Sequence, residues 1–138
     1  MTPRPMSKAD AATLDALVEG LADPTSSDGP SSRRLGETSN SGTMPLSIGR
    51  LGPRLFSLAH YYKQNGDTMR DPDVELYRDP QGRWFPVTFQ QDGTMPVYTV
   101  ALNLDADGIA GVYRRRYASL RDFVRMWLGN LRDQYGIT

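Results

Sequence analysis

The sequence predicts an α+β domain: an antiparallel meander sheet of four to five strands, backed by a C-terminal helix, with an N-terminal helix on a flexible linker. Three observations predict this fold class. Segments rich in β-branched and aromatic residues follow one another through residues 54–104. Turn-forming residues separate them by gaps too short for crossovers, so neighbouring strands pair antiparallel. The two ends of the chain instead repeat apolar residues at helical spacing.

Length and composition suggest how the chain is divided. A chain of 138 residues can bury one core but is too short for two ordinary domains. Glycine and proline supply 13 and 10 residues and the apolar fraction is 38%, so part of the chain is expected to lie outside that core. We therefore expect an N-terminal accessory helix in residues 1–22, a flexible linker in residues 23–45, and an α+β core domain in residues 46–138.

The N-terminal helix is predicted from its start signal and its apolar stripe. Ser7 and Asp10 have the spacing of a capping box, with aspartate in place of the usual glutamate or glutamine. Four apolar residues then share one helical face: Leu14, Leu17, Val18 and Leu21. The linker that follows has six serines and no aromatic residue, so it cannot bury enough apolar area to offset its ordering entropy. Its arginines, Arg33 and Arg34, are expected to be solvated, or to become ordered on binding a partner.

The strands are predicted from alternation between clear turn signals. Four segments have strand composition: residues 54–62, 73–78, 83–91 and 96–104, with residues 109–117 as a fifth candidate. The sequences between them, such as QNGD and RDPQGR, are typical of tight turns. The Asn-Gly pair at positions 65 and 66 suits a turn that needs positive φ.

The C-terminal helix has the strongest periodic signal of the chain. Ser119 and Asp122 again have the spacing of a capping box. One helical face then collects large apolar side chains: Leu120, Phe123, Val124, Trp127, Leu131 and Tyr135. Because no other segment could cover this face, we expect the helix to pack on the sheet.

Composition and motifs exclude several function classes. Without cysteine the chain has no disulfide and no thiolate nucleophile, and a single histidine excludes a histidine-rich metal site within one chain. No segment reads as a phosphate-binding loop, a dinucleotide fingerprint or a nucleophile elbow. No apolar run is long enough to span a bilayer, and the first residues lack a secretory leader. We expect a cytoplasmic protein with no cofactor and no membrane partner.

The segment around the single histidine is the first candidate site. His60 shares the more apolar face of its strand with aromatic and leucine side chains, which favours a half-buried structural histidine over a catalytic base. Four acidic residues follow it: Asp67, Asp71, Asp73 and Glu75. Carboxylates are the ligands that Mg²⁺ prefers. Hairpin nucleases of this kind also need a lysine after the second acid, and Leu76 and Tyr77 stand there. The structural interpretation of the acidic residues is therefore favoured.

The second candidate site is the basic C-terminal region. Residues 109–138 carry 6 arginines against 2 aspartates, although the whole chain has no net charge. Arg121, Arg125 and Arg132 form a stripe beside the apolar helical face, and Arg114, Arg115 and Arg116 lie just upstream. Such a stripe could contact nucleic-acid phosphates or an acidic protein. It could equally be the solvated side of a docked helix.

One longer motif resembles a known family. His60-Tyr61, Gln64-Asn65-Gly66-Asp67 and Arg70-Asp71-Pro72 are followed by Phe85-Pro86 and Gln91-Asp92. This pattern resembles a small domain of unknown function found in plasmid- and phage-encoded bacterial proteins. The resemblance implies a context of mobile DNA in a bacterial host cell rather than a reaction. It marks the following residues as a candidate binding loop: His60, Tyr61, Gln64, Asn65, Asp67, Arg70 and Asp71.

These observations lead to one functional expectation and two alternatives. We expect a non-enzymatic accessory protein of a phage or plasmid that binds a bacterial host or mobile-element protein. An inhibitor of a bacterial defence system, of the anti-CRISPR kind, fits this description. The first alternative is a metal-dependent nuclease or hydrolase that uses the acidic residues. The second is a nucleic-acid-binding module that uses the arginine stripe.

Overall fold

The computed structural model describes residues 2–36, 45–93 and 95–137. Its elements, in chain order, are α1 (Lys8–Val18), β1 (Ser32–Leu35), β2 (Leu46–Arg50), β3 (Leu55–Gln64), β4 (Asp67–Arg78), β5 (Trp84–Gln91), β6 (Val97–Val100), β7 (Leu102–Asp105), β8 (Gly108–Val112) and α2 (Arg114–Tyr135). β1 to β6 form one antiparallel sheet in sequential order, and β7 pairs with β8 in a second, smaller sheet. The predicted α+β meander is confirmed, but it has more strands than the four or five expected.

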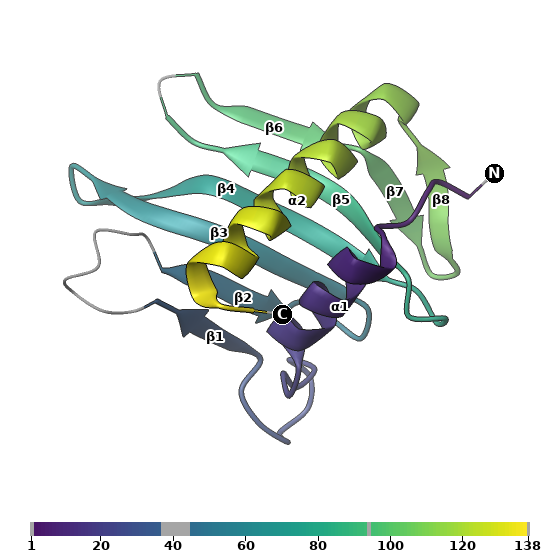
Figure 1. Cartoon of the computed structure of the whole chain (residues 1–138), viewed down its shortest axis with the longest axis horizontal. Coiled ribbons are helices and arrows are strands. Elements are labelled where there is room, and N and C mark those ends of the chain that lie inside the picture. Colours follow the sequence, from purple (N-terminus) through teal and green to yellow (C-terminus); the bar gives the residue numbers. More distant parts are fainter. Residues whose placement is uncertain (1, 37–44, 94, 138) are drawn as a thin grey trace.

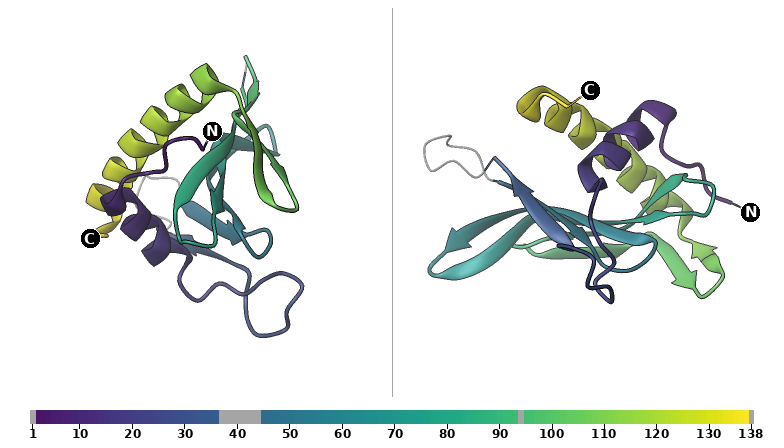
Figure 2. Two further views of the ribbon diagram at one scale, coloured as in Figure 1. Left: turned by 90° about the vertical axis from the view of Figure 1, so that its right-hand side faces the viewer. Right: turned by 90° about the horizontal axis from the view of Figure 1, so that it is seen from below.

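Both helices lie on the same face of the six-stranded sheet (Figure 2). α2 crosses the strands diagonally, and α1 lies beside its C-terminal half (Figure 1). The core fills the space between these layers, and its fully buried side chains include Phe56, Leu58, Leu76, Trp84, Leu128 and Leu131. On the opposite face the β7–β8 hairpin reaches Tyr77, because Gly108 has no side chain there: a Cβ would lie 3.0 Å from the tyrosine hydroxyl.

The N-terminal helix begins where the sequence predicts. Ser7 is the N-cap residue, and its hydroxyl accepts a hydrogen bond from the Asp10 amide at 3.1 Å. The helix ends before Gly20, whose positive φ of 81° suits the end of a helix. All four residues of the predicted stripe are buried: Leu14, Leu17, Val18 and Leu21. They join the same core as the sheet and α2, so this helix is an integral layer of the fold rather than a separate accessory.

The segment expected to be an unstructured linker contains a strand. β1 pairs with β2 over Ser32–Leu35, and Arg33 reaches across to the end of α1. Its guanidinium donates to the carbonyl of Glu19 at 2.7 Å, to that of Ala16 at 3.1 Å and to that of Leu17. These carbonyls are left without partners at the end of any helix, so the arginine satisfies them. Arg33 is therefore not solvated as expected; part of the predicted linker, residues 37–44, lies outside the described residues.

The last predicted strand is divided between the two sheets. β6 ends at Val100, and Ala101 continues its pairing with a hydrogen bond from its amide to the Val87 carbonyl at 2.8 Å. Leu102 then begins β7, which turns away to pair with β8. The fifth candidate strand is shorter than expected, since α2 begins at Arg114. The predicted capping pair, Ser119 and Asp122, lies inside this helix, so that prediction is wrong.

The β3–β4 hairpin confirms the predicted turn. Asn65 and Gly66 adopt φ values of 53° and 87°, and Gln64 pairs directly with Asp67. This is the two-residue hairpin loop in which positive φ at both positions matches the twist of the strands. A register shift between Ala59 and Tyr61 divides the long hairpin into two paired stretches.

Candidate functional site

His60 is buried and satisfied within the core. Its Nδ1 lies 3.2 Å from the carbonyl oxygen of Pro45, and because a carbonyl only accepts, Nδ1 donates the hydrogen. The imidazole ring also meets the Trp127 ring edge-on, with 5.6 Å between centroids. The side chain is 8% exposed. These contacts give His60 a packing role and place it on the helix side of the sheet, away from the carboxylates.

The four acidic residues all lie along β4, which begins at Asp67 rather than at Asp73, where the predicted strand begins. Asp67 follows the turn and is exposed, whereas Asp71 accepts a hydrogen bond from Gln91 Nε2 at 2.7 Å. Asp73 and Glu75 point to the face that the helices leave uncovered, since Val74 between them is fully buried. In the described part of the chain, no three histidine or carboxylate side chains come close enough together to hold a metal ion.

Two halves of the resemblance motif meet where β4 passes the end of β5. The Arg70 amide donates to Asp92 Oδ2 at 2.9 Å, and the Asp92 amide donates to the Arg70 carbonyl at the same distance. The guanidinium of Arg70 also lies 3.4 Å from Asp92 Oδ2 and 3.6 Å from Asp73 Oδ2. This clamp joins parts of the chain 22 residues apart, so these motif residues have structural work in the sheet.

The surroundings of Asp73, beside this clamp, disfavour ionisation of its carboxyl group. Burial raises the pKa of Asp73, and the nearby carboxylates of Glu75 and Asp92 raise it further, while Arg70 opposes them. One of its oxygens, Oδ1, is buried without a hydrogen-bond partner. Burial, and then the charge of Asp73, raises the pKa of Tyr61 on the neighbouring strand. The cluster is thus strained electrostatically, but it does not assemble a set of metal ligands.

The predicted arginine stripe is used mainly inside the protein. Arg121 Nε donates to the Pro5 carbonyl at 3.0 Å. Arg132 Nη1 lies 3.0 Å from Asp10 Oδ1 and donates to the Thr13 hydroxyl at 2.9 Å. Two of the three arginines therefore fasten the N-terminal segment to α2, and Arg125 is the member of the stripe with an exposed side chain.

The first turn of α2 concentrates positive charge at the surface. Arg114, Arg115 and Arg116 are all exposed, and this turn has no acidic residue and no side-chain cap at Tyr113. Free amides already make a helix N-terminus positive, so three cations here repel rather than stabilise it. Arg116 stacks over the Tyr113 ring at 4.5 Å and donates to the Val100 carbonyl at 3.4 Å. The arrangement would favour a negatively charged partner.

An apolar groove opens beside this turn, between β6 and α2. It has a volume of about 480 Å³ and is lined by Phe89, Val97, Thr99, Arg115, Arg116, Ser119, Leu120 and Phe123. We call it the β6 groove. Phe123 meets Phe89 edge-on at its floor, with 5.3 Å between ring centroids. Val97, which lines the groove, is 45% exposed. Met95 and Tyr98 are 85% and 63% exposed but do not line the groove, and the Tyr98 side chain, between those of Val97 and Thr99, points to the opposite face of the sheet. A hollow lined by exposed apolar side chains is typical of an interaction surface.

Sequence reasoning missed this groove for an identifiable reason. Phe123 belongs to the apolar face that predicts packing of α2 on the sheet, and Phe89 lies within the predicted strand of residues 83–91, so neither signals an open groove. Only the run Met95–Tyr98, apolar but next to a turn, signals exposure in the sequence. That β6 is an edge strand follows from the strand order, which the sequence does not state.

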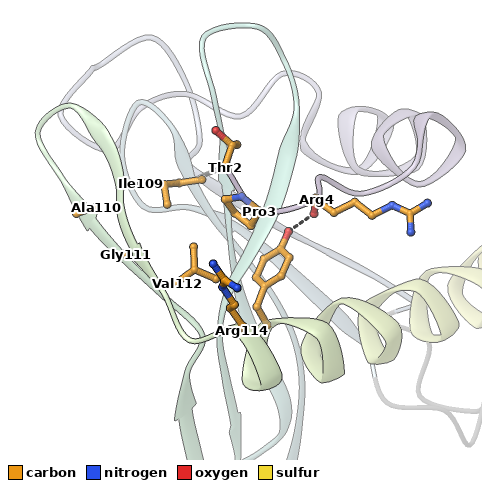
Figure 3. A pocket seen from close by; sticks show the side chains of 9 residues that line it. Thr2, Pro3, Arg4, Ile109, Ala110, Gly111, Val112 and Arg114 are labelled. Atoms are coloured by element: carbon orange, nitrogen blue, oxygen red, sulfur yellow. Dashed lines mark hydrogen bonds between the residues drawn. The ribbon is translucent and has the colours of Figure 1, made fainter.

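A second hollow, of about 650 Å³, lies between the first residues of the chain and β8 (Figure 3). The Tyr117 hydroxyl donates to the Arg4 carbonyl across it, which ties this segment to α2. Burial strongly raises the pKa of this phenol, so it stays protonated as a donor. The Arg4 side chain points away from the hollow (Figure 3). The lining of this hollow therefore offers a hydrogen bond to the backbone and the side chain of Arg114, which do not make up a catalytic site.

The fold and these surfaces define a small α+β domain whose prominent external feature is a basic, apolar groove at a sheet edge. The chain belongs to a family described as a domain of unknown function (DUF6908), whose model matches residues 26–137. The match covers β1 to α2 and is consistent with the domain of unknown function that the sequence predicts. No curated protein and no solved structure matches the chain significantly. Neither α1 nor α2 has the length and hydropathy needed to cross a membrane.

Proposed function

We propose that this protein is a non-enzymatic accessory protein that binds a bacterial host or mobile-element protein through the β6 groove. The observation that carries this proposal is the exposure of the apolar side chains that line this groove, chiefly Val97 beside Phe89 and Phe123. Leaving such side chains in water is unfavourable, and covering them releases about 25 cal/mol per Å² of apolar surface. A partner that fills the groove therefore gains affinity from surface that the isolated chain leaves exposed.

The proposed setting is the cytoplasm of a bacterial host cell. The resemblance of the motif from His60 to Asp92 to proteins of plasmids and phages supports a role for the domain in mobile elements. Inhibition of a bacterial defence system, of the anti-CRISPR kind, is the role we propose for such a binder. The basic first turn of α2 supports a partner with an acidic contact surface.

The test compares two exposed apolar residues of equal exposure. Val97 in the groove and Leu51 far from it in sequence are each 45% exposed. Lysate of the bacterial host is passed over immobilised wild type, Val97→Gln and Leu51→Gln, and each captured protein is then purified for calorimetry. We expect Val97→Gln to weaken the wild-type complex about fivefold, because half of a valine side chain is worth about 1 kcal/mol when buried. Leu51→Gln should bind like wild type.

Two outcomes would contradict the proposal. Equal loss in both variants would show that the captured protein does not use the groove. Capture of no protein by the wild type, at several salt concentrations, would remove the binding function itself.

A further inference from the structure

We infer that the β6 groove receives an extended, acidic segment of its partner, which adds to β6 as a further strand. This inference rests on the proposed function and specifies the chemistry and conformation of the partner. Three independent observations support it: the open backbone of β6, the contrast between the two edges of the sheet, and the charge around the groove.

The outward backbone groups of β6 can be assigned from one hydrogen bond. The Ala101 amide donates to the Val87 carbonyl, so these two residues form a hydrogen-bonded pair of the antiparallel ladder. Hydrogen-bonded and non-hydrogen-bonded pairs alternate, which places Thr99 and Val97 with their backbone groups toward β5. The backbone groups of Tyr98 and Val100 therefore point away from the sheet.

Arg116 supports this assignment, because its guanidinium reaches the Val100 carbonyl from outside the sheet. The Tyr98 amide and carbonyl remain as the central donor and acceptor of the free edge. β6 lies along the outer margin of the sheet in Figure 1. An added strand that pairs with Tyr98 would extend the sheet at this edge.

The two edges of the sheet differ in protection. β1, the other edge strand, reads SRRL: Arg34 is exposed there, and Arg33 joins the strand to the end of α1. Proteins commonly block exposed edges with charged residues or prolines, because an open edge recruits foreign strands. β6 reads VYTV and has no charged residue or proline within it. An edge left open in a protein that protects its other edge is suited to binding a strand.

The charge around the groove selects an acidic occupant. The lining includes Arg115 and Arg116 and no acidic residue. Side chains of an added strand alternate between faces, so every second residue would face Leu120, Phe123 and these arginines. A partner segment with both acidic and β-branched residues would complement the two arginines and the apolar lining of the groove. A second copy of this chain would instead bring two arginine clusters together, which disfavours it.

The test uses peptides selected on the full-length protein. A displayed library of random twelve-residue peptides is enriched on wild type and depleted on Val97→Gln, and the best peptide is synthesised with a fluorescent label. Binding is then measured by anisotropy to wild type, Tyr98→Pro and Tyr98→Thr. Proline removes the outward amide of residue 98 without removing a bond to β5, whereas threonine keeps that amide and removes the aromatic ring. Circular dichroism and thermal unfolding confirm that each variant is folded.

We expect selected peptides with net negative charge, at least tenfold weaker binding to Tyr98→Pro, and binding within threefold of wild type for Tyr98→Thr. Replacing Arg115 and Arg116 with glutamine should weaken binding and flatten its salt dependence. Equal losses in both Tyr98 variants would overturn strand addition while leaving groove binding intact. Enrichment of neutral or basic peptides would overturn the inference that the partner segment is acidic. If the wild type sediments as a dimer and Tyr98→Pro does not, the occupant of the groove is a second copy of this chain. If no peptide distinguishes wild type from Val97→Gln, the proposed function itself fails.

Discussion

The ion pair between Arg132 and Asp10 gives the sharpest prediction about stability. Asp10 is 3% exposed, and the Arg132 side chain, 30% exposed, covers it with Nη1 3.0 Å from Oδ1. Arg132→Met keeps the apolar stem of the side chain and removes its charge. The carboxylate of Asp10 is then left buried without its cation, and the Thr13 hydroxyl loses a donor.

The expected loss can be estimated from these contacts. Breaking a buried pair by removing one partner costs about 3–5 kcal/mol, and the partial exposure of Arg132 reduces this to roughly 2 kcal/mol. The lost hydrogen bond to Thr13 adds about 1 kcal/mol. We therefore expect Arg132→Met to lower the free energy of unfolding by about 3 kcal/mol, and the same change in an Asp10→Asn background to cost about 1 kcal/mol.

Urea unfolding followed by tryptophan fluorescence measures these values, since Trp84 and Trp127 are both buried. Arg125→Met is the matched control, because it removes an exposed arginine from the same helix and should change stability by less than about 0.5 kcal/mol. The coupling energy from the double-mutant cycle should be about 2 kcal/mol. Equal effects of Arg132→Met and Arg125→Met would refute an internal role for Arg132, and a coupling near zero would refute the ion pair.

Four further predictions test other parts of the structure. Asp73→Asn should stabilise the protein at neutral pH, because the raised pKa of Asp73 makes the native state bind more protons than the unfolded state just above pH 3.8, and the stability of the wild type therefore falls as the pH rises through that window. In urea titrations the stabilisation by Asp73→Asn should vanish near pH 3, and a stabilisation that does not change with pH would contradict this explanation. Arg33→Met should cost about 2 kcal/mol, because three helix-end carbonyls lose their donor, and an unchanged urea midpoint would show that this cap is dispensable. Residues 46–138 alone should not unfold cooperatively, since they lack five buried apolar side chains worth about 10 kcal/mol together; a sharp thermal transition would restore the division expected from the sequence. Calorimetry with Mg²⁺ and Mn²⁺ should show no saturable binding, and binding that Asp73→Ala abolishes would support the metal-dependent alternative.

Local signals in the sequence predicted much of the fold. The capping serine at position 7, the Asn-Gly turn and the apolar face of α2 all depend on residues within a few positions of one another, and each was confirmed. Strand alternation likewise identified β3, β4 and β5, because each face of these strands meets one kind of environment along most of its length. The sequence also placed His60 on the apolar side of its strand, where it is buried.

The errors concern contacts between distant segments. Composition made residues 23–45 look unstructured, but Arg33 gains helix-end carbonyls that come from a different element. Ala101 has no turn signal, and only the competing β7–β8 hairpin explains why the strand divides there. The arginine stripe was visible as a pattern, yet its use depends on Pro5 and Asp10, which are more than a hundred residues away.

The contacts between the N-terminal segment and α2 have a consequence for folding during biosynthesis. Three residues of α2 contact the N-terminal segment: Tyr117 bonds to Arg4, Arg121 to Pro5 and Arg132 to Asp10. The partners are 113, 116 and 122 residues apart in the sequence. The part of the sheet that α2 covers therefore stays exposed on the ribosome until α2 has emerged. Contacts this distant in sequence slow folding, because the entropy of closing a long loop is lost before they form. Until these contacts form, the apolar face that α2 covers is open to contact with other chains.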